Sequence, residues 1–346
     1  MSDILADFAY LNGKPTETAL LKAQPDHFQV TEDLGFEFSG EGEHLMVLIR
    51  KTGENTSFVA NELAKACGVK SQAVSWAGLK DRHAVTEQWL SVHLPGNQTP
   101  DFTEFLKQYP SIEIVKTQRH NKKLRPGDLS GNFFKLVLTQ VSDASALVPR
   151  FESIKQFGVP NYFGQQRFGH QGNNLDEARR WGRENVRTRN QKKRSMYLST
   201  ARSWIFNQIV SSRIESDFYQ QFVEGDIALE SGKTHPVESP EQWNEKLNEG
   251  LVQITAALAG DNALPVTGKA LELEQPFLDA EPDLMALIRG NRMRHERRPI
   301  ALVPQQFDWE IAEQMVTMTF WLPAGHYATS IVRELVVATE AERSYG

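Results

Sequence analysis

One carboxylate of this sequence, Asp81, stands between two cations in the segment AGLKDRH (77–83). Lys80 precedes it and Arg82 follows it, directly after the apolar segment AVSWAG (73–78). Because nearby positive charge favours the ionised form of a carboxyl group, we expect Asp81 to be charged at neutral pH and ready to act as a nucleophile. A loop aspartate that only caps a turn has the same neighbours, so the residue types leave its role open.

Other motifs that could carry chemistry are incomplete. SGKT (231–234) matches the end of a phosphate-binding loop, but Ile227 stands where the first glycine is required. HERR (295–298) lacks the second histidine of a zinc-protease helix, and the glycine signatures of NAD enzymes and α/β-hydrolases are missing. The single cysteine, Cys67, is poor material for a zinc site. The sequence therefore predicts carboxylate chemistry that uses neither a cofactor nor a metal.

The elements that would position Asp81 are short strands. Apolar and β-branched runs predict strands at 44–51, 73–78, 87–94, 111–116, 132–138 and 315–321. Periodicity and end signals predict helices at 57–68 with Ser57 as N-cap, at 175–185, at 199–216 with Ser199 as N-cap, and at 329–341. The tail thus resembles the first half more than the turn-rich and helical middle. This pattern is expected when one domain is inserted into another and the C-terminal strand completes the first domain's sheet.

Composition narrows the class of protein. The chain has 346 residues, 40% hydrophobic and 24% charged, which is typical of a globular protein of about two domains. It contains no apolar run of about 18 residues, so we expect no membrane-spanning helix. The first residues have neither a basic nor an apolar leader region, which predicts no secretory signal. Together with the lone cysteine, these features predict a cytoplasmic protein.

The net charge of −6 hides three strongly basic segments. Residues 116–135 carry six Lys and Arg against one acid, 179–202 carry nine against one, and 289–298 carry five against one. Solvated helix faces would explain any single segment. Three segments rich in Arg favour a polyanionic partner, because guanidinium groups bind phosphate at two points.

Five separated motifs resemble the TruD family of tRNA pseudouridine synthases. They are SWAGLKDRHAVTEQW (75–89), HNKKLRPGDLSGNFF (120–134), GVPNYFGQQRFG (158–169), KRSMYLSTARSWIFNQIV (193–210) and FWLPAGHYATSIVREL (320–335). The resemblance runs from residue 20 to the last predicted helix and is weakest from about 215 to 290.

The resemblance implies a fold, an activity and a partner. The expected fold is α/β (α+β), with a pseudouridine synthase domain of mixed, largely antiparallel sheet at 1–157 and 302–346 and an inserted TRUD-type α/β domain at 158–301. The family converts a D-arm uridine of tRNA, position 13 in tRNA numbering, to pseudouridine without metal or cofactor. The partner is then tRNA; no membrane and no obligate protein partner are inferred.

The resemblance also assigns roles to residues. Asp81 matches the family's catalytic aspartate, and Lys22 matches the lysine that pairs with it. Asn132 and Phe134 match an Asn-x-Phe motif that holds the target base. Phe28 and Tyr327 match two further base-contacting aromatics, although the family pattern leads us to expect Phe at position 327. From charge, we expect the RNA backbone to contact the basic residues Lys122, Lys123, Arg125, Arg167, Lys192, Lys193 and Arg194, together with the arginines of 289–298 and with His170.

Physical reasoning agrees with a base taken out of its stack. Extruding a base costs a few kcal/mol, and an aromatic platform returns about 1–3 kcal/mol per stacked base. Alternation along 132–138 puts Asn132 and Phe134 on one strand face with Leu136 and Leu138. Asp81 would then either attack C1′ of the ribose or remove the C2′ proton, and the sequence leaves both routes open.

Three other functions remain compatible with the residues. A non-catalytic RNA-binding protein would need the basic segments but not Asp81. A glycosidase would need two carboxylates about 5–9 Å apart, whereas this motif supplies one. A purely structural module would need neither.

Overall fold

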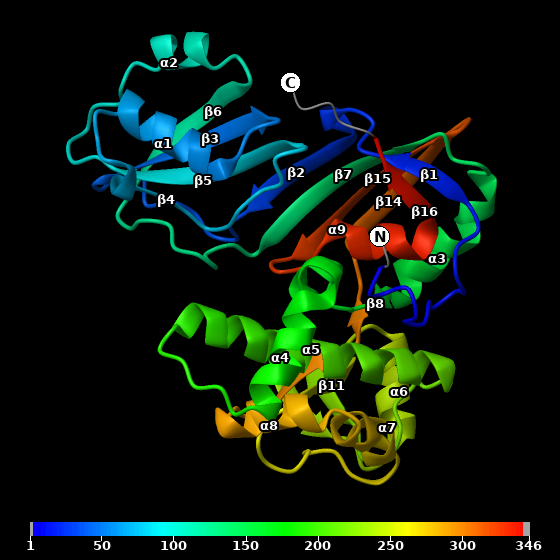
Figure 1. Cartoon of the computed structure of the whole chain (residues 1–346). Coiled ribbons are helices and arrows are strands. Elements are labelled where there is room, and N and C mark those ends of the chain that lie inside the picture. The colour runs from blue at the N-terminus through cyan, green and yellow to red at the C-terminus, as the bar shows by residue number, and fades with distance from the viewer. Residues whose placement is uncertain (1–2, 342–346) are drawn as a thin grey trace. The chain divides into compact units, whose positions relative to one another are not determined.

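The computed structural model describes residues 3–341, which form two compact units (Figure 1). The large-sheet unit comprises Thr16–Phe151, Pro304–Ala328 and the chain from Leu335 onward. The helix-rich unit comprises the chain up to Pro15, Glu152–Val303 and Thr329–Glu334. The domain boundaries expected from the sequence stay a prediction. Within the described residues, no helix is long and apolar enough to span a membrane.

Ten described strands form one sheet in the large-sheet unit. The order is β14-β15-β7-β2-β5-β3-β6, with β1 pairing β7 and β16, and with β4 pairing β5. The strands are β1 (Thr18–Leu21), β2 (Phe28–Asp33), β3 (His44–Thr52), β4 (Val74–Trp76), β5 (Val85–His93), β6 (Ile112–His120), β7 (Gly131–Thr139), β14 (Gln305–Ala312), β15 (Met315–Pro323) and β16 (Val337–Glu340). Only β1–β16 and β2–β5 are parallel pairs among them. The expectation of a mixed, largely antiparallel sheet is confirmed.

Helix α1 (Thr56–Ala66) covers the β3–β5 part of this sheet (Figure 1). Its buried Val59 and Leu63 pack against Leu45 and Val47 of β3. A short helix, α2 (Thr103–Gln108), adds Phe105 to the same core. Because side chains alternate along β3, every second residue from Leu45 to Lys51 faces the side of the sheet that α1 covers.

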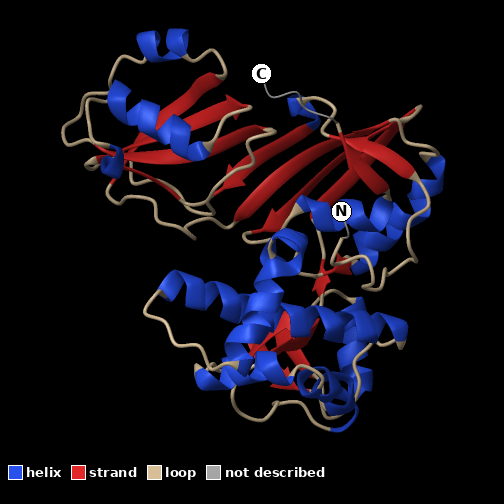
Figure 2. Cartoon of the chain, viewed as in Figure 1, coloured by secondary structure: helices blue, strands red, loops and turns tan. Residues whose placement is uncertain are grey.

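The helix-rich unit surrounds a small antiparallel sheet with helices (Figure 2). The sheet has the order β10-β9-β11-β12. Its strands are β9 (Ile227–Glu230), β10 (Lys233–Pro236), β11 (Gln253–Leu258) and β12 (Glu296–Pro299), and β8 (Val159–Pro160) pairs separately with β13 (Ala301–Leu302). The helices are α4 (Asn173–Arg183), α5 (Gln191–Glu215), α6 (Pro240–Asn248), α7 (Gly268–Asp279) and α8 (Pro282–Gly290). The division between the units falls within α3 (Val148–Phe157) and α9 (Ala328–Leu335).

Three predicted element ends are wrong. Helix α1 has Asn55 rather than Ser57 as its N-cap. Helix α5 starts eight residues before the predicted start at Ser199, because the Asn190 side chain accepts a hydrogen bond from the Lys193 amide at 3.1 Å. The helix predicted at 329–341 ends at Leu335, and the chain continues as strand β16, which pairs with β1. Pairing with a distant strand overrides the local helical pattern.

Candidate active site

One face of the large sheet carries Asn132 and Phe134, two of the predicted base-contacting residues. Strand register places Glu32 opposite Asn132, and Val30 opposite Phe134. Side chains of directly paired residues share a face. Lys51 of β3 lies on the same face, because it pairs with Thr86, which in turn pairs with Val30. We call this the Asp81 face of the sheet.

Asp81 lies in the loop between β4 and β5 and meets Lys22 there. The Lys22 ammonium donates a hydrogen bond to Oδ2 of Asp81, and the His83 amide donates to Oδ1 at 2.9 Å. The Lys22 side chain is 8% exposed and that of Asp81 is 36% exposed. Both carboxylate oxygens are therefore oriented by donors, while one side of the group stays open to solvent.

Lys22 adopts a backbone conformation that favours glycine. Its φ is +56°, in the left-handed region, directly after β1 ends at Leu21. A side chain in that region costs of the order of 1 kcal/mol. The conformation turns the lysine onto Asp81, and its ammonium also lies 4.4 Å from the centre of the Phe28 ring. Eight other non-glycine residues of the described chain also have a positive φ, so the contact with Asp81, and not the conformation alone, distinguishes Lys22.

The two residues that flank Asp81 in sequence bind other parts of the protein and do not contact its carboxylate. Lys80 forms a buried ion pair with Glu32 of β2, at 2.9 Å. Arg82 donates through Nε to the Gly53 carbonyl at 3.2 Å. The cation on the carboxylate is therefore Lys22, 59 residues away in sequence, and not the flanking pair from which we inferred its charge.

A second lysine, Lys51 of β3, contacts the backbone of the loop that carries Asp81. Nζ of Lys51 donates to the Glu54 carbonyl at 2.7 Å and lies 3.4 Å from the Asp81 carbonyl. Lys51 is 1% exposed, and its burial lowers the pKa of the ammonium to about 8. The backbone of Asp81 thus lies against a buried cation, in addition to the cation on its side chain.

The pKa of Asp81 is lowered from its ordinary value. Burial, the largest influence, acts to raise this pKa, but it is outweighed by the hydrogen bonds from Lys22 and the His83 amide and by the charge of Lys22. The group is therefore an ionised carboxylate throughout the neutral range. This is the protonation state that a nucleophile or base requires.

The predicted base-contacting residues occupy different positions. Phe28 and Phe134 are buried, with ring centres 6.3 Å apart, and Phe134 also stacks on Phe320 at 5.4 Å. Oδ1 of Asn132 is buried and has no hydrogen-bond partner in the described chain. Tyr327 is 57% exposed and follows the end of β15, where Leu322 pairs with Asn132.

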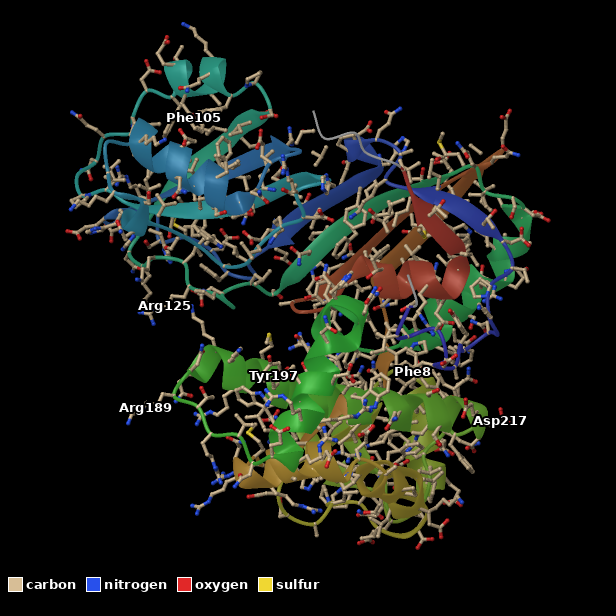
Figure 3. All side chains as sticks on the ribbon, in the orientation of Figure 1. Phe8, Phe105, Arg125, Arg189, Tyr197 and Asp217 are labelled. Atoms are coloured by element: carbon tan, nitrogen blue, oxygen red, sulfur yellow. The ribbon has the colours of Figure 1, made fainter. Side chains whose placement is uncertain are left out.

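Seven of the predicted RNA-backbone residues fall into both units. Lys122, Lys123 and Arg125 are exposed on the loop between β6 and β7 of the large-sheet unit. Figure 3 shows the Arg125 side chain extending away from its loop, as Arg189 does from the loop before α5. In the helix-rich unit, Lys192 and Lys193 are exposed in the first turn of α5, Arg194 is half-buried, and Arg167 donates to Ser199 at 2.5 Å.

Part of the basic segment 179–202 is already neutralised. Arg179 pairs with Glu281 at 2.7 Å, Arg180 with Glu177 and Glu184, and Arg183 with Asp283 at 3.2 Å. These cations are less available to an external anion than the sequence count suggests.

Sequence reasoning missed three residues of the site. Glu340 lies 3.7 Å from the Lys22 ammonium, but it was assigned to a helix instead of β16. Glu32 and Lys51 gave a usable signal, since each is a charged residue at an inward position of an alternating strand. The chemistry available here is that of an ionised carboxylate, oriented by a buried lysine, on a face with aromatic rings and an unpartnered amide oxygen.

Comparison with known proteins identifies the family. The family model described as tRNA pseudouridine synthase D (TruD) matches residues 6–178 and 173–335. The protein named tRNA pseudouridine synthase D from Vibrio parahaemolyticus is 67% identical over all of both chains, and its namesake from Vibrio cholerae is 65% identical over all of this chain and 96% of its own.

A solved structure has the same fold. The crystal structure named for tRNA pseudouridine synthase D (TruD) from Methanosarcina mazei superposes with a TM-score of 0.73 at 24% identity, covering 95% of this chain and 94% of the other. Taken with the family match and the curated relatives, the chain belongs to the TruD family of tRNA pseudouridine synthases, isomerases that convert uridine to pseudouridine.

Proposed function

We propose that the protein isomerises a uridine in the D arm of tRNA, at position 13, and that Asp81 is its catalytic residue. The observation that carries the assignment is the Lys22–Asp81 pair: an ionised, half-exposed carboxylate beside a buried ammonium. The reaction follows from the family to which the chain belongs. The carboxylate of this pair is ionised and partly open to solvent, so it can approach the ribose of a bound nucleotide.

The reaction rearranges the bonds of a single nucleoside. The bond between C1′ and N1 breaks, the uracil turns in place, and C1′ bonds to C5. C5 loses its proton and N1 gains one, so the product is an isomer and needs no external oxidant or reductant. Asp81 acts either by attack on C1′ or by removal of the C2′ proton, and both routes use the same ionised oxygen.

The neighbouring residues would hold the extruded base. The unpartnered Oδ1 of Asn132 would accept an N–H of the uracil, since a buried amide oxygen needs a donor. Phe28 and Phe134 would form the apolar wall beside the base. Tyr327, which is exposed, would stack on the base from the solvent side.

The remaining expectations follow from this assignment. Residues 1–157 and 302–346 would form the catalytic domain and 158–301 the inserted domain, working in the cytoplasm where tRNA is modified. Lys122, Lys123, Arg125, Arg167, Lys192, Lys193 and Arg194 would follow the RNA backbone. Arginine and lysine have long, flexible side chains that can reach phosphate groups. Such contacts position the RNA without reading its base sequence.

The test is Asp81→Asn in purified protein with unmodified tRNA transcript, with pseudouridine mapped by chemical derivatisation. We expect turnover to fall about 10⁴-fold or more, as when a nucleophile is removed, while the tRNA dissociation constant changes less than about twofold. Glu104→Gln, which removes an exposed carboxylate of the same unit that pairs with Lys107, should leave both unchanged.

Two results would contradict the proposal. Wild-type turnover in Asp81→Asn would leave an RNA-binding protein whose carboxylate is not catalytic. Release of free uracil would instead indicate glycoside hydrolysis, for which Glu340 offers a second carboxylate beside Lys22.

A further inference from the structure

The helix-rich unit contains an arginine-lined pocket of about 690 Å³. Arg194 and Arg202 reach it from α5, Arg187 from the loop before α5, Arg292 from the turn after α8, and Arg298 from β12. Glu296 is the one acid in its lining. Since a pocket of 300–1,000 Å³ is of the size that holds a small organic ligand, both its volume and its charge need an explanation.

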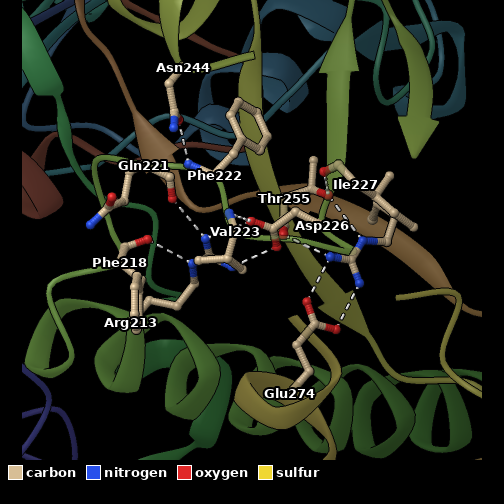
Figure 4. A network of polar contacts seen from close by, with 11 residues as sticks. Arg213, Phe218, Gln221, Phe222, Val223, Asp226, Ile227, Asn244, Thr255 and Glu274 are labelled. Carbon is tan, nitrogen blue, oxygen red and sulfur yellow. Dashed lines mark hydrogen bonds and ion pairs between the residues drawn. The ribbon is translucent and has the colours of Figure 1, made fainter. Parts of the chain in front are cut away.

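Buried arginines elsewhere in the same unit are neutralised. Arg213 forms two hydrogen bonds with Asp226, at 2.8 and 2.9 Å, and both side chains are fully buried (Figure 4). Arg297 does the same with Glu274, at 2.8 and 2.7 Å. Burying a guanidinium is expensive unless a carboxylate or phosphate accompanies it.

Two arginines of the pocket, the buried Arg202 and the half-buried Arg298, lack a carboxylate at hydrogen-bond distance. Arg298 donates to the Asn161 carbonyl and amide oxygens, its Nε has no acceptor, and within the described chain it forms no ion pair with a carboxylate. Burial, followed by repulsion from Arg167, lowers its pKa to about 10. Arg202 donates to three backbone carbonyls and reaches the exposed Glu296 only at 3.7 Å. Arg298 therefore has no carboxylate partner within the described chain, and Arg202 has only the long ion pair with the exposed Glu296.

The backbone at Arg292 provides an independent observation. Its φ is +51°, at the end of α8, where the Met293 amide bonds back to the Ile288 carbonyl. Glycine is the usual residue at this left-handed position of a helix terminus. An arginine stands there instead, and its side chain contributes to the lining of the pocket.

The other walls of the pocket are apolar. Phe163, Leu198, Leu258 and Met293 contribute to the lining, and the Arg298 guanidinium stacks on the Phe163 ring at 4.1 Å. A bare phosphate needs neither this volume nor these surfaces. A nucleotide needs both, since its base is flat and apolar on its faces while its phosphates are anionic.

We propose that this pocket binds one unstacked nucleotide of the RNA substrate, with its base against the apolar wall and its phosphates on the arginines. The proposal rests on the proposed function in taking its ligand from tRNA. It adds a second recognition site, built within the helix-rich unit and separate in role from the Asp81 face.

The experiment compares two double variants of equal charge. Arg187→Gln/Arg292→Gln removes two pocket cations, whereas Arg180→Gln/Arg183→Gln removes two cations of the same unit that are paired with carboxylates outside the pocket. For tRNA transcript, we expect the pocket variant to raise the dissociation constant at least tenfold and to lower the salt slope by about two, while the control changes by less than about twofold. Equal loss in both variants would overturn the proposal.

A competition arm identifies the ligand. UMP or AMP should displace tRNA from the wild type at lower concentration than inorganic phosphate does, and should lose this advantage in the pocket variant. If phosphate competes equally well, the base has no place in the pocket and the proposal is wrong. If a mononucleotide binds tightly without displacing tRNA, the natural ligand is a free nucleotide and not the RNA.

A third variant separates recognition from folding. Arg292→Gly relieves the left-handed strain, so we expect an unchanged or higher melting temperature together with weaker tRNA binding. A structural role for Arg292 predicts the opposite pair of results. Turnover of the pocket variants at saturating tRNA should still depend on Asp81. Failure of the pocket proposal would therefore leave the proposed function intact. If the wild type showed no isomerase activity, only the proposed function would be contradicted.

Discussion

In the large-sheet unit, the buried ammonium of Lys22 lies on the carboxylate of Asp81, and that of Lys80 lies 2.9 Å from Glu32. In the pocket of the helix-rich unit, the half-buried Arg298 lies against aromatic rings and neutral oxygens. A paired cation fixes the position and charge of its protein partner. A desolvated cation without a carboxylate partner can still bind an anionic ligand, but its desolvation lowers the stability of the folded protein.

The largest expected effect breaks a neutralised pair of the helix-rich unit. Asp226→Ala leaves the fully buried Arg213 without its carboxylate, so we expect a loss of about 3–5 kcal/mol in unfolding free energy. Urea denaturation measures it. A loss below about 1 kcal/mol would mean that paired and unpaired arginines are equivalent in this unit, and the comparison would fail.

The next effect concerns the paired cation at the Asp81 face. Lys22→Met removes the donor that orients and ionises Asp81, so we expect turnover to fall about 100-fold. Burial then dominates the pKa of Asp81 and raises it, which moves the acid limb of the pH–rate profile to higher pH. Lys65→Met, at an exposed lysine of α1, should change neither quantity.

The linked effect on stability has a defined sign. Because the folded-state pKa of Asp81 is lowered, its pairing stabilises the fold above the unfolded-state pKa of about 3.9 and loses this contribution as the pH falls through the folded-state pKa. In Lys22→Met, this acid-side loss should be absent from unfolding curves measured between pH 5 and pH 2.

A smaller effect is expected at the unpaired cation. Arg298→Met removes a desolvated charge without orphaning a carboxylate, so the unfolding free energy should change by less than about 1 kcal/mol while tRNA binding weakens about tenfold. Fluorescence titration and urea denaturation of the same preparation test both parts. Strong destabilisation with unchanged binding would give Arg298 the structural role that Arg213 has.

The last effect appears only at alkaline pH and concerns Lys51. Its folded-state pKa of about 8 lies below the ordinary value of 10.5, so between these two pH values the unfolded chain binds more protons and stability rises with pH. Over this range, we expect the wild type to gain up to about 3 kcal/mol of unfolding free energy relative to Lys51→Met, since one pKa unit corresponds to about 1.4 kcal/mol. An identical pH dependence in both proteins would show that the ammonium below Asp81 is solvated.

The fold was predictable from the sequence where local pattern decides it. Alternation along 132–138 gave the face shared by Asn132 and Phe134, and the apolar run at 44–51 gave β3. The pairing of distant strands leaves no pattern in the local sequence. The pairing of β1 with β16 was therefore not predicted, and the helix predicted at 329–341 extends beyond its true end at Leu335. Cooperative pairing outweighs propensity in such segments.

For the candidate site, the sequence pattern pointed to Asp81 but not to the contacts that set its charge, and the catalytic role of Asp81 stays a prediction. The loop AGLKDRH singled out Asp81, whereas its flanking cations bind Glu32 and the Gly53 carbonyl. The family resemblance, and not the residue pattern, pointed to Lys22. The arginine pocket was visible only as charge counts, because sequence cannot tell Arg180, which is already neutralised, from Arg298, which is not.

The pairing of β1 with β16 has a consequence for how the enzyme is made. Lys22 leaves β1 at Leu21, which pairs with Glu340, so the lysine on the aspartate is anchored by a strand that the ribosome adds some 320 residues later. A nascent chain stopped before Val337 carries Asp81 but lacks the anchor of its partner. We therefore expect ribosome-bound chains to be inert towards tRNA until synthesis has passed this strand.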